Sequence, residues 1–511
     1  MRAGQRSRRA GCRARVRCVS RGLVAGGHPA VADAAATVLA QGGNAFDAVV
    51  AAGFAAAVAE PALTSLGGGG FLLARTAQGE STLFDFFVDT PGRGLAGRSF
   101  HPHFEPVSIA FPASDQVFNV GRGSVAVPGC LAGYLHVHER LGVLSLGDVV
   151  APAVTLARTG VVISPMSASI VELLWPILNR TADTRELFAP HGHPVRAGER
   201  FANIDLAEFL DRLGREPGHT FHHGELAAAF AADQAGGGGF VTEEDLAAYR
   251  VIEREPLSID YRGHRVLTNP APSFGGTLVA LTLQLLQDGG TLPERGTPEH
   301  AVALVGAMVE TDRRRAAEAA DLRPRATRGT THVSVADCHG NVASMTTSNG
   351  EASGHLVPGT GILLNNMLGE DDLHPRGFHA APAGARVASM MSPTVVLDPS
   401  GAPRLVVGSG GSKRIRTTIV QVVSAVVDHE VPIEAAVPAP RLHWDGDLLQ
   451  VEPGWSRAAV AALRERWPVN EWAEQNLYFG GAHAVTPGDP GGEGSAAGDP
   501  RRGGAVAMTR A

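Results

Sequence analysis

Thr330 and Ser348 carry hydroxyl groups at a spacing that a β-hairpin would bring together. Residues 329–350 contain two runs of alternating, β-branched character on either side of a turn cluster at 337–341, in which Gly340 can adopt a positive φ. A turn centred on this cluster places Thr330 opposite Ser348, and directly opposed residues on one face have Cβ atoms about 5 Å apart. The pattern therefore predicts two neighbouring hydroxyls at the open end of the hairpin.

Thr330 also stands where a self-cleaving chain would be cut. It follows Gly329 and an Arg-rich, helical-looking stretch at 311–328, so it lies at an abrupt loop-to-strand junction. Cleavage between Gly329 and Thr330 would leave Thr330 with a free α-amine beside its hydroxyl, and one residue would then supply both nucleophile and general base. An α-amine has a pKa of about 8, so much of it is neutral near neutral pH. The alternative is a plain cross-strand hydrogen bond between the two hydroxyls.

Several segments together resemble the γ-glutamyltranspeptidase family. The run Thr-Thr-His-Val-Ser-Val at 330–335, followed by Asp337, Gly340 and Asn341 and by Gly-Ile-Leu-Leu-Asn-Asn at 361–366, is similar to the start of the family's small subunit. Further similar segments lie at 42–47, 60–61, 67–71, 124–129, 272–276, 392–394 and 410–412, so the resemblance extends over nearly the whole chain.

The resemblance implies a fold and a domain organisation. The expected fold is an α+β N-terminal-nucleophile (Ntn) hydrolase, a four-layer αββα sandwich. The family is made as one chain and cut into two parts that stay together. Here these would be a large-subunit part, residues 23–329, and a small-subunit part, residues 330–511.

The same resemblance implies roles for individual residues. Thr330 is the expected nucleophile, and Ser348 replaces the family's second catalytic Thr while keeping the hydroxyl. Gly410 and Gly411 correspond to the two glycines that hold the oxyanion, and unsatisfied amides before the helix expected at 414–428 suit that task. A plain helix N-cap by Ser412 is the alternative interpretation of this loop. The expected substrate-binding residues are Asn349, Asp372 and Ser389. The family's substrate Asn is either supplied by Asn349 or lost as Gly350, and the acid is assigned to Asp372 because the segment after Asn366 is two residues longer than the family's usual form.

Two positions depart from the family pattern. Phe87 stands where the family has an Arg that grips the α-carboxylate of the γ-glutamyl group, and Met390 replaces one of two carboxylate-binding serines. A hydrogen bond to a charged group contributes about 1.5–3 kcal/mol, so its loss would weaken γ-glutamyl binding by one to two orders of magnitude. Arg93 is the candidate to compensate. The catalytic residues are therefore better preserved than the glutamyl pocket.

Three functions remain open on these grounds. The resemblance implies transfer of a γ-glutamyl group, as from glutathione, to water or to an acceptor amine. Phe87 and Met390 favour instead an acylase for a more apolar acyl group, of the cephalosporin-acylase type. The third possibility is a non-catalytic, uncleaved scaffold that uses the cleft for binding.

Composition excludes several other classes of protein. A content of 44% hydrophobic and 19% charged residues indicates a globular chain, and the net charge of -7 argues against a nucleic-acid-binding protein. Four cysteines, at 12, 18, 130 and 338, are too few and too scattered for a disulfide framework or a zinc site. We therefore expect no metal and no cofactor.

The first 60 residues bear on the location of the protein in the cell. The helix expected from Asn44 to Glu60 contains Asp47 and is shorter than the about 20 apolar residues of a membrane span, so no membrane span is expected. Residues 1–22 are Arg-rich and are predicted to form a disordered basic tail. Arginines interrupt every apolar run there, so no signal peptide is evident and a cytoplasmic location is favoured. Export remains open if the true start lies elsewhere.

Overall fold

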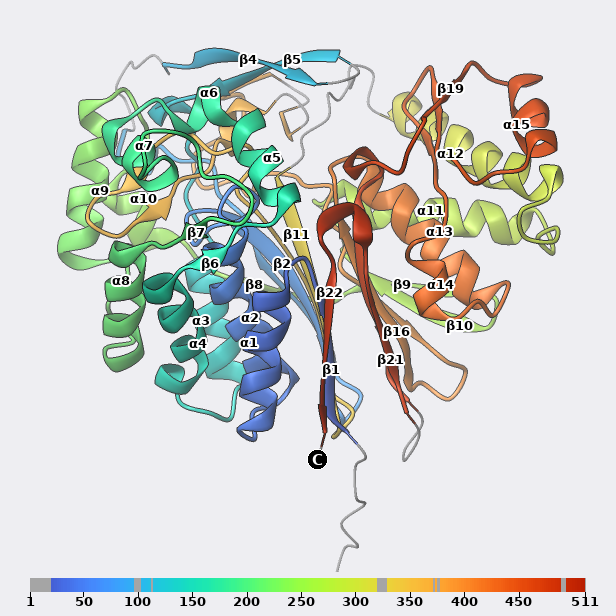
Figure 1. The fold of residues 1–511 in the computed structure, drawn as a ribbon, viewed down its shortest axis with the longest axis horizontal. Helices are drawn as coiled ribbons and strands as arrows, with labels where there is room; N and C mark the ends of the chain where they lie inside the picture. The colour runs from blue at the N-terminus through green and yellow to red at the C-terminus, as the bar shows by residue number, and fades with distance from the viewer. Residues whose placement is uncertain are drawn as a thin grey trace, which may run out of the picture.

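Two β-sheets lie face to face at the centre of the molecule, with helices on the outer face of each (Figure 1). The computed structural model describes residues 20–95, 103–111, 114–318, 329–370, 373–374, 377–488 and 493–510. The mixed α+β character and the order helix, sheet, sheet, helix agree with the sequence prediction. The predicted tail at 1–22 lies almost entirely outside the described residues.

The first sheet combines strands from both sides of the predicted cleavage point. Its order is β22 (Ala505–Arg510), β1 (Ser20–Gly26), β11 (Thr330–Asp337), β12 (Val342–Ser348), β2 (Gly69–Arg75), β3 (Ser81–Phe86) and β8 (Ile252–Arg254). Strand β1 pairs with β22 and β11, and β2 pairs with β12. Because these hydrogen-bond ladders join the two parts of the chain, a cut before β11 would leave them in one sheet.

The second sheet carries the loop that is expected to hold the oxyanion. Its order is β21 (Ser495–Gly498), β20 (Gly481–Thr486), β16 (Pro403–Gly410), β15 (Thr394–Leu397), β10 (His264–Thr268) and β9 (Leu257–Tyr261). Strands β15 and β16 pair antiparallel as a hairpin that turns at 398–401. Strand β16 packs against β11 and β12 of the first sheet, so the loop after β16 lies close to the start of β11.

Helices α1 (Pro29–Ala40) and α2 (Ala45–Ala59) cover the first sheet, and α2 confirms the helix expected from Asn44 to Glu60. Asn44 and Asp47 form a reciprocal capping box at the start of α2, which explains why an almost wholly apolar helix begins at that point. Buried side chains from α1, α2 and the first sheet form one core cluster. A second core cluster lies between the two sheets and between the second sheet and the helices that cover it. None of the described helices has the length and apolar character needed to cross a membrane.

The other elements surround these layers. Beside α1 and α2 lie α3 (Cys130–Leu141), α4 (Leu146–Thr159), α5 (Pro165–Leu173), α6 (Trp175–Leu178), α7 (Ala182–Phe188), α8 (Ile204–Arg215), α9 (Gly224–Gly236) and α10 (Glu243–Ala248). On the second sheet's side lie α11 (Phe274–Asp288), α12 (Pro298–Glu318), α13 (Arg414–Val427), α14 (Ile433–Ala436) and α15 (Arg457–Arg464). The short strands are β4 (Glu105–Phe111), β5 (Ser114–Val120), β6 (Val161–Val162), β7 (Arg200–Phe201), β13 (Leu356–Val357), β14 (Ile362–Leu363), β17 (Leu442–Trp444), β18 (Leu449–Val451) and β19 (Val469–Glu471).

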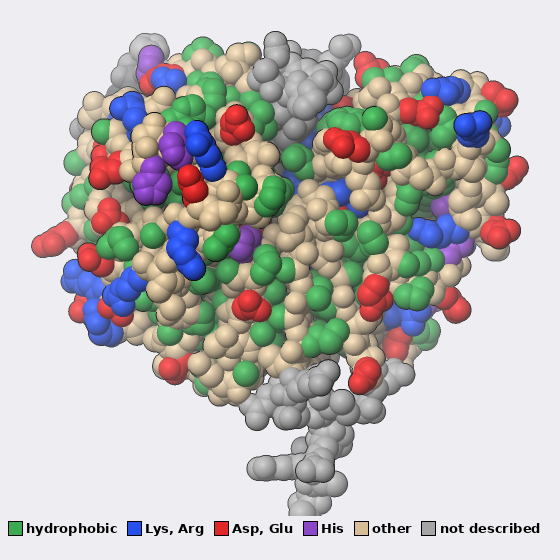
Figure 2. Space-filling view, in the orientation of Figure 1, with side chains coloured by type: hydrophobic (Ala, Val, Ile, Leu, Met, Phe, Trp, Pro, Cys, Tyr) green, Lys and Arg blue, Asp and Glu red, His purple; other side chains and the backbone are tan. Residues whose placement is uncertain are grey.

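On the face drawn in Figure 2, acidic and basic side chains are interspersed over the surface. The mixture is consistent with the modest net charge of the sequence.

Candidate active site

The hairpin of β11 and β12 brings the two predicted hydroxyls together. Thr330 is paired with Ser348, which confirms the predicted register, and both side chains are buried. Thr330 Oγ1 donates to Ser348 Oγ at 3.3 Å. Ser348 Oγ donates to the carbonyl oxygen of Gly329 and accepts from the backbone N–H of Gly350 at 3.1 Å. One hydroxyl therefore polarises the carbonyl of the peptide bond that is predicted to be cut, and the other belongs to the predicted nucleophile.

Gly329 occupies a position that has no room for a side chain. A Cβ at this residue would lie 1.8 Å from the carbonyl oxygen of Gly350, two residues after the end of β12. The residue before the predicted cut is thus held by backbone packing against the same segment that positions Ser348.

The loop after β16 lies against the nucleophile. A Cβ at Gly410 would lie 2.3 Å from the carbonyl oxygen of Thr330, and Gly411 has a φ of +115°, a conformation that favours glycine. Helix α13 has Lys413 at its N-cap, without a side-chain capping bond, so the alternative of a helix N-cap by Ser412 is wrong. The loop therefore has a local reason for its glycines, and its role as oxyanion hole remains a prediction.

A pocket opens beside Thr330. Its lining residues come from both halves of the sequence and are Phe87, Thr330, Ser348, Met367, Glu370, Leu373, Ser389, Met390, Met391, Ser412 and Ile415. Three residues predicted for the site, Thr330, Ser348 and Ser389, therefore share one pocket. Both positions that depart from the family pattern, Phe87 and Met390, lie in it as well.

Of the other two predicted substrate-binding residues, Asn349 lies outside the pocket lining and Asp372 stays a prediction. Asn349 donates through Nδ2 to the carbonyl oxygen of Leu364 at 3.3 Å and does not line the pocket. Asp372 lies outside the described residues. The sequence prediction missed Glu370, two residues earlier, because it assumed a two-residue insertion after Asn366; counting without an insertion would have found it. Among the described lining residues of the pocket, the acidic one is Glu370.

Comparisons with known proteins decide the family. The sequence model described as Gamma-glutamyltranspeptidase matches residues 31–323 and 309–509. The chain belongs to the γ-glutamyltranspeptidase family. Its fold is similar to that of the cephalosporin acylase from Bacillus halodurans, with a TM-score of 0.77 and 27% identity over 99% of each chain. The protein is accordingly a γ-glutamyltranspeptidase-family Ntn hydrolase, as the resemblance implied.

Relatives within the family carry two kinds of name. The chain is 32% identical to the Acylase ACY 1 proenzyme of Pseudomonas sp. (strain SE83), over 88% of this chain and 87% of the relative. It is 30% identical to the Glutathione hydrolase proenzyme of Escherichia coli (strain K12), over 94% and 90%. Both are proenzymes, which is consistent with two subunits from one precursor. Because both kinds match at similar identity, membership of the family does not decide the acyl group.

Phe87 makes its side of the pocket apolar in this family member. Its ring is fully buried and stacks on Phe71 with 5.5 Å between ring centroids. Arg93, the candidate to compensate, does not line the pocket; its guanidinium lies close to Gly384. No lining residue of the pocket, as the described chain defines it, is basic, and Glu370 is acidic.

Arg386 lies near Phe87, but its guanidinium contacts other groups of the protein. Arg386 lies 3.1 Å from Asp89 and donates to Tyr249 Oη at 2.7 Å and to the carbonyl oxygen of Phe87. Burial raises the pKa of Asp89 to about 6, and the charge of Arg386 opposes that rise. Arg386 thus holds the backbone beneath Phe87, and its charge is directed at carboxylates of the protein.

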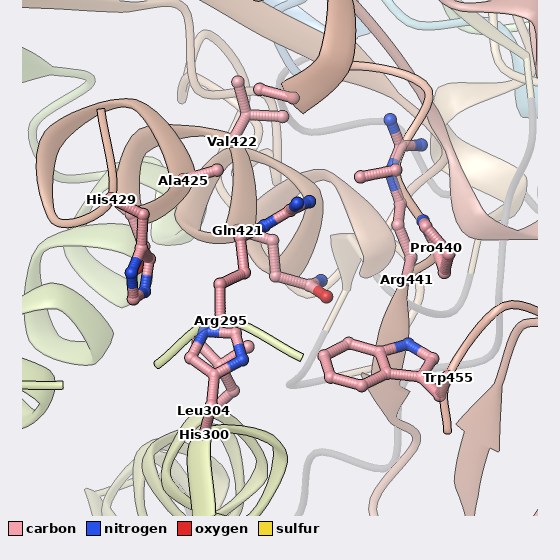
Figure 3. A pocket seen from close by; sticks show the side chains of 13 residues that line it. Arg295, His300, Leu304, Gln421, Val422, Ala425, His429, Pro440, Arg441 and Trp455 are labelled. Atoms are coloured by element: carbon pink, nitrogen blue, oxygen red, sulfur yellow. The ribbon is translucent and has the colours of Figure 1, made fainter. Parts of the chain in front are cut away.

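A second pocket, between α12 and α13, contains none of these residues (Figure 3). His300 lies between His429 and Trp455, with centroid distances of 5.0 and 6.0 Å. Burial lowers the pKa of His300 to about 4, so its ring is neutral near neutral pH. Across the described part of the chain, no three His, Cys, Asp or Glu side chains are grouped as metal ligands.

We expect Ser348→Ala to slow self-cleavage by about 10²-fold or more, because it removes the hydroxyl that donates to the Gly329 carbonyl, where negative charge develops. The measurement is the fraction of cut chain against time after cell-free synthesis, read by mass. Ser348→Thr keeps the hydroxyl and is the matched control, with cleavage retained. Cleavage of the Ala variant at the wild-type rate would show that this bond has no part in the reaction.

Proposed function

We propose that this protein is a self-cleaving amide hydrolase whose N-terminal nucleophile is Thr330 and whose acyl group is more apolar than γ-glutamyl. The observation that carries the proposal is the pocket itself. It combines the paired hydroxyls of Thr330 and Ser348 with Phe87 and Met390, and none of its described lining residues supplies a cation. A substrate carboxylate would need such a cation.

The proposed self-cleavage uses the bonds around Gly329. Thr330 Oγ1 attacks the carbonyl carbon of Gly329, which closes a five-membered ring, while Ser348 donates to the carbonyl oxygen. The bond from that carbon to the Thr330 nitrogen then breaks, and the nitrogen takes up the hydroxyl proton. The product is an ester between Gly329 and Thr330. Water hydrolyses this ester, which leaves a carboxylate on Gly329 and a free α-amine on Thr330.

The proposed catalytic cycle repeats this chemistry on a bound amide. The neutral α-amine of Thr330 takes the proton of its own hydroxyl as Oγ1 attacks the substrate carbonyl. Backbone amides of Gly410 and Gly411 stabilise the oxyanion, in keeping with the contact between this loop and Thr330. The ammonium returns its proton to the leaving amine, and an acyl ester remains on Thr330. Water or an acceptor amine then attacks that ester and releases the acyl group.

γ-Glutamyl transfer is the second candidate because of Glu370 and Ser389. Glu370 gives the pocket an acidic group suited to a substrate ammonium, and Ser389 offers a hydroxyl. The relative from Escherichia coli named as a glutathione hydrolase adds support. However, the γ-glutamyl group also carries an α-carboxylate, which would face Phe87 or Met390 without an opposite charge. We therefore place it second.

A panel of anilides separates these proposals. Phenylacetyl, glutaryl and γ-glutamyl p-nitroanilides are compared by kcat/KM, each against Thr330→Ala as background. The apolar acyl group is expected to exceed the others by about 10-fold, the effect of one missing charge-assisted contact. A preference for γ-glutamyl would favour the second candidate. Absence of Thr330-dependent turnover on all three would favour the non-catalytic scaffold.

A further inference from the structure

A buried arginine from the far end of the chain touches the nucleophile. Arg502 ends the short 3₁₀ helix η6 (Pro500–Arg502), between β21 and β22. Its Nη1 donates to the carbonyl oxygen of Thr330 at 3.1 Å, although 172 residues separate the two in sequence. The side chain is only 3% exposed, so this contact is shielded from solvent. The backbone of the nucleophile is therefore held by a guanidinium as well as by its own strand.

The same guanidinium lies against the loop that is proposed to hold the oxyanion. A Cβ at Gly410 would lie 3.1 Å from Arg502 Nη1, and one at Gly411 would lie 3.4 Å from Nη2. The aliphatic stem of Arg502 packs on Gly481, which pairs with Gly410 across β20 and β16. One side chain thus contacts the nucleophile residue, both glycines and the strand behind them, and can fix their relative position.

Charged groups from four elements surround Arg502. Glu60 follows α2, Glu351 follows β12 and Asp499 precedes η6, and all three attract the guanidinium, whereas Arg414 at the start of α13 repels it. Burial lowers the pKa of Arg502 to about 10, and Arg414 lowers it in the same direction. The side chain is therefore still cationic near neutral pH.

Glu60 does not cancel this charge completely. Burial raises the pKa of Glu60 to about 7, while hydrogen bonds from the Thr331 hydroxyl, at 3.0 and 3.1 Å, and the charge of Arg502 lower it. The carboxyl group is consequently only partly ionised near neutral pH. Glu351 and Asp499 oppose the charge as well, but it is Arg502 that is hydrogen-bonded directly to the first residue of β11.

We propose that Arg502 is a positioning residue that aligns Thr330 with Gly410 and Gly411 and, after cleavage, keeps the α-amine of Thr330 neutral. This rests on the proposed function, in which that amine is the general base. The nitrogen and carbonyl oxygen of one residue are about 3 Å apart, so a guanidinium bonded to the oxygen lies within a few ångströms of the amine. A nearby like charge disfavours the ammonium form. Arg502 therefore increases the fraction of active base.

The test compares substitutions that separate charge from hydrogen bonding. Arg502→Gln keeps an N–H donor and loses the charge, so the acidic limb of the pH profile of kcat/KM should move upward by about one pH unit or more. Arg502→Lys keeps the charge, so the acidic limb of the pH profile should stay in place. We expect kcat to fall in this variant, because lysine lacks the forked hydrogen-bond donors of the guanidinium. Arg502→Met, which retains a stem against Gly481, replaces the Gln variant if that variant does not fold.

Arg501→Lys is the matched control. Arg501 is its buried neighbour, and its guanidinium is bound to Glu452 and Asp499. Its substitution perturbs the same turn, and the limb should not move. A second readout is the pH dependence of acetylation of the Thr330 α-amine, followed by mass of the peptide that begins there; it should shift by the same amount in Arg502→Gln.

The outcomes are distinguishable. Suppose that the wild type is cut and active, and that Arg502→Gln is slower but shows the same acidic limb of the pH profile and the same titration of the Thr330 α-amine. Arg502 then has only a structural role, and this inference is wrong. If the wild type is neither cut nor active, the proposed function is wrong and this inference with it.

Discussion

Thr330→Ala is expected to leave the chain uncut and to lower amide hydrolysis by about 10⁶-fold, to the level of background, because removal of a nucleophile has an effect of that order. The substitution removes the oxygen that attacks Gly329 during maturation and the substrate afterwards. The measurement is the intact mass of the purified chain under denaturing conditions. Wild type should give two fragments that meet between Gly329 and Thr330, and the variant should give one.

Thr330→Ser is the matched control for this substitution. It retains both the hydroxyl and, after cleavage, the α-amine, so cleavage and turnover should persist. The serine hydroxyl could also donate the hydrogen bond to Ser348 that the Thr330 hydroxyl makes. A wild-type chain that stays intact on prolonged incubation would contradict the proposal and favour an uncleaved binding scaffold.

Local sequence signals predicted the hairpin of β11 and β12 and the start of helix α2 correctly. The register of Thr330 with Ser348 follows from a turn and from strand alternation, which act over a few residues. The start of α2 follows from Asn44 and Asp47, which satisfy the first amides of the helix through their own side chains. Such features depend little on the rest of the chain, so they can be predicted without knowledge of the tertiary structure.

The composition of the pocket depended on packing between distant segments. Leu373, Met391 and Ile415 line it, yet each has the character of an ordinary core residue in the sequence. Nothing in the sequence around Arg502 indicates that it contacts Thr330, because the two residues are 172 positions apart and meet only in the folded chain. Glu370, which also lines the pocket, was missed because of the alignment assumed after Asn366. The sequence therefore predicted the pairing of Thr330 with Ser348 better than the composition of the pocket around them.

The backbone and the ring of Phe87 are both held in place by neighbouring residues. Its backbone is held by Arg386 and by Tyr249 Oη, which donates to the Phe87 carbonyl oxygen at 2.7 Å. The position of the side chain is thus fixed from beneath by polar contacts, and the ring itself is held by Phe71. A substitution at 87 should accordingly change the chemistry of the pocket wall more than its location.

We expect Phe87→Arg to raise kcat/KM for glutaryl and γ-glutamyl anilides, relative to phenylacetyl anilide, by about 10- to 100-fold, the effect of one charge-assisted contact. The new guanidinium would face the acyl group in a pocket that has no other basic lining residue among those described. Glu370 would attract part of its charge, so combining the change with Met390→Ser, which adds a hydroxyl, should increase the effect. The measurement is the ratio of kcat/KM values on the three anilides.

Phe87→Leu is the control that separates charge from shape. It removes the stacking on Phe71 without adding a cation, so activity on the apolar anilide should fall and the carboxylate-bearing anilides should gain nothing. Thermal unfolding of each variant shows whether the loss of a buried ring has destabilised the fold, since truncation of a buried aromatic residue costs about 3–5 kcal/mol at the extreme. A folded Phe87→Arg variant with unchanged ratios would mean that residue 87 does not contact the acyl group. The selectivity of the enzyme would then have to arise from other lining residues, such as Glu370 and Ser389.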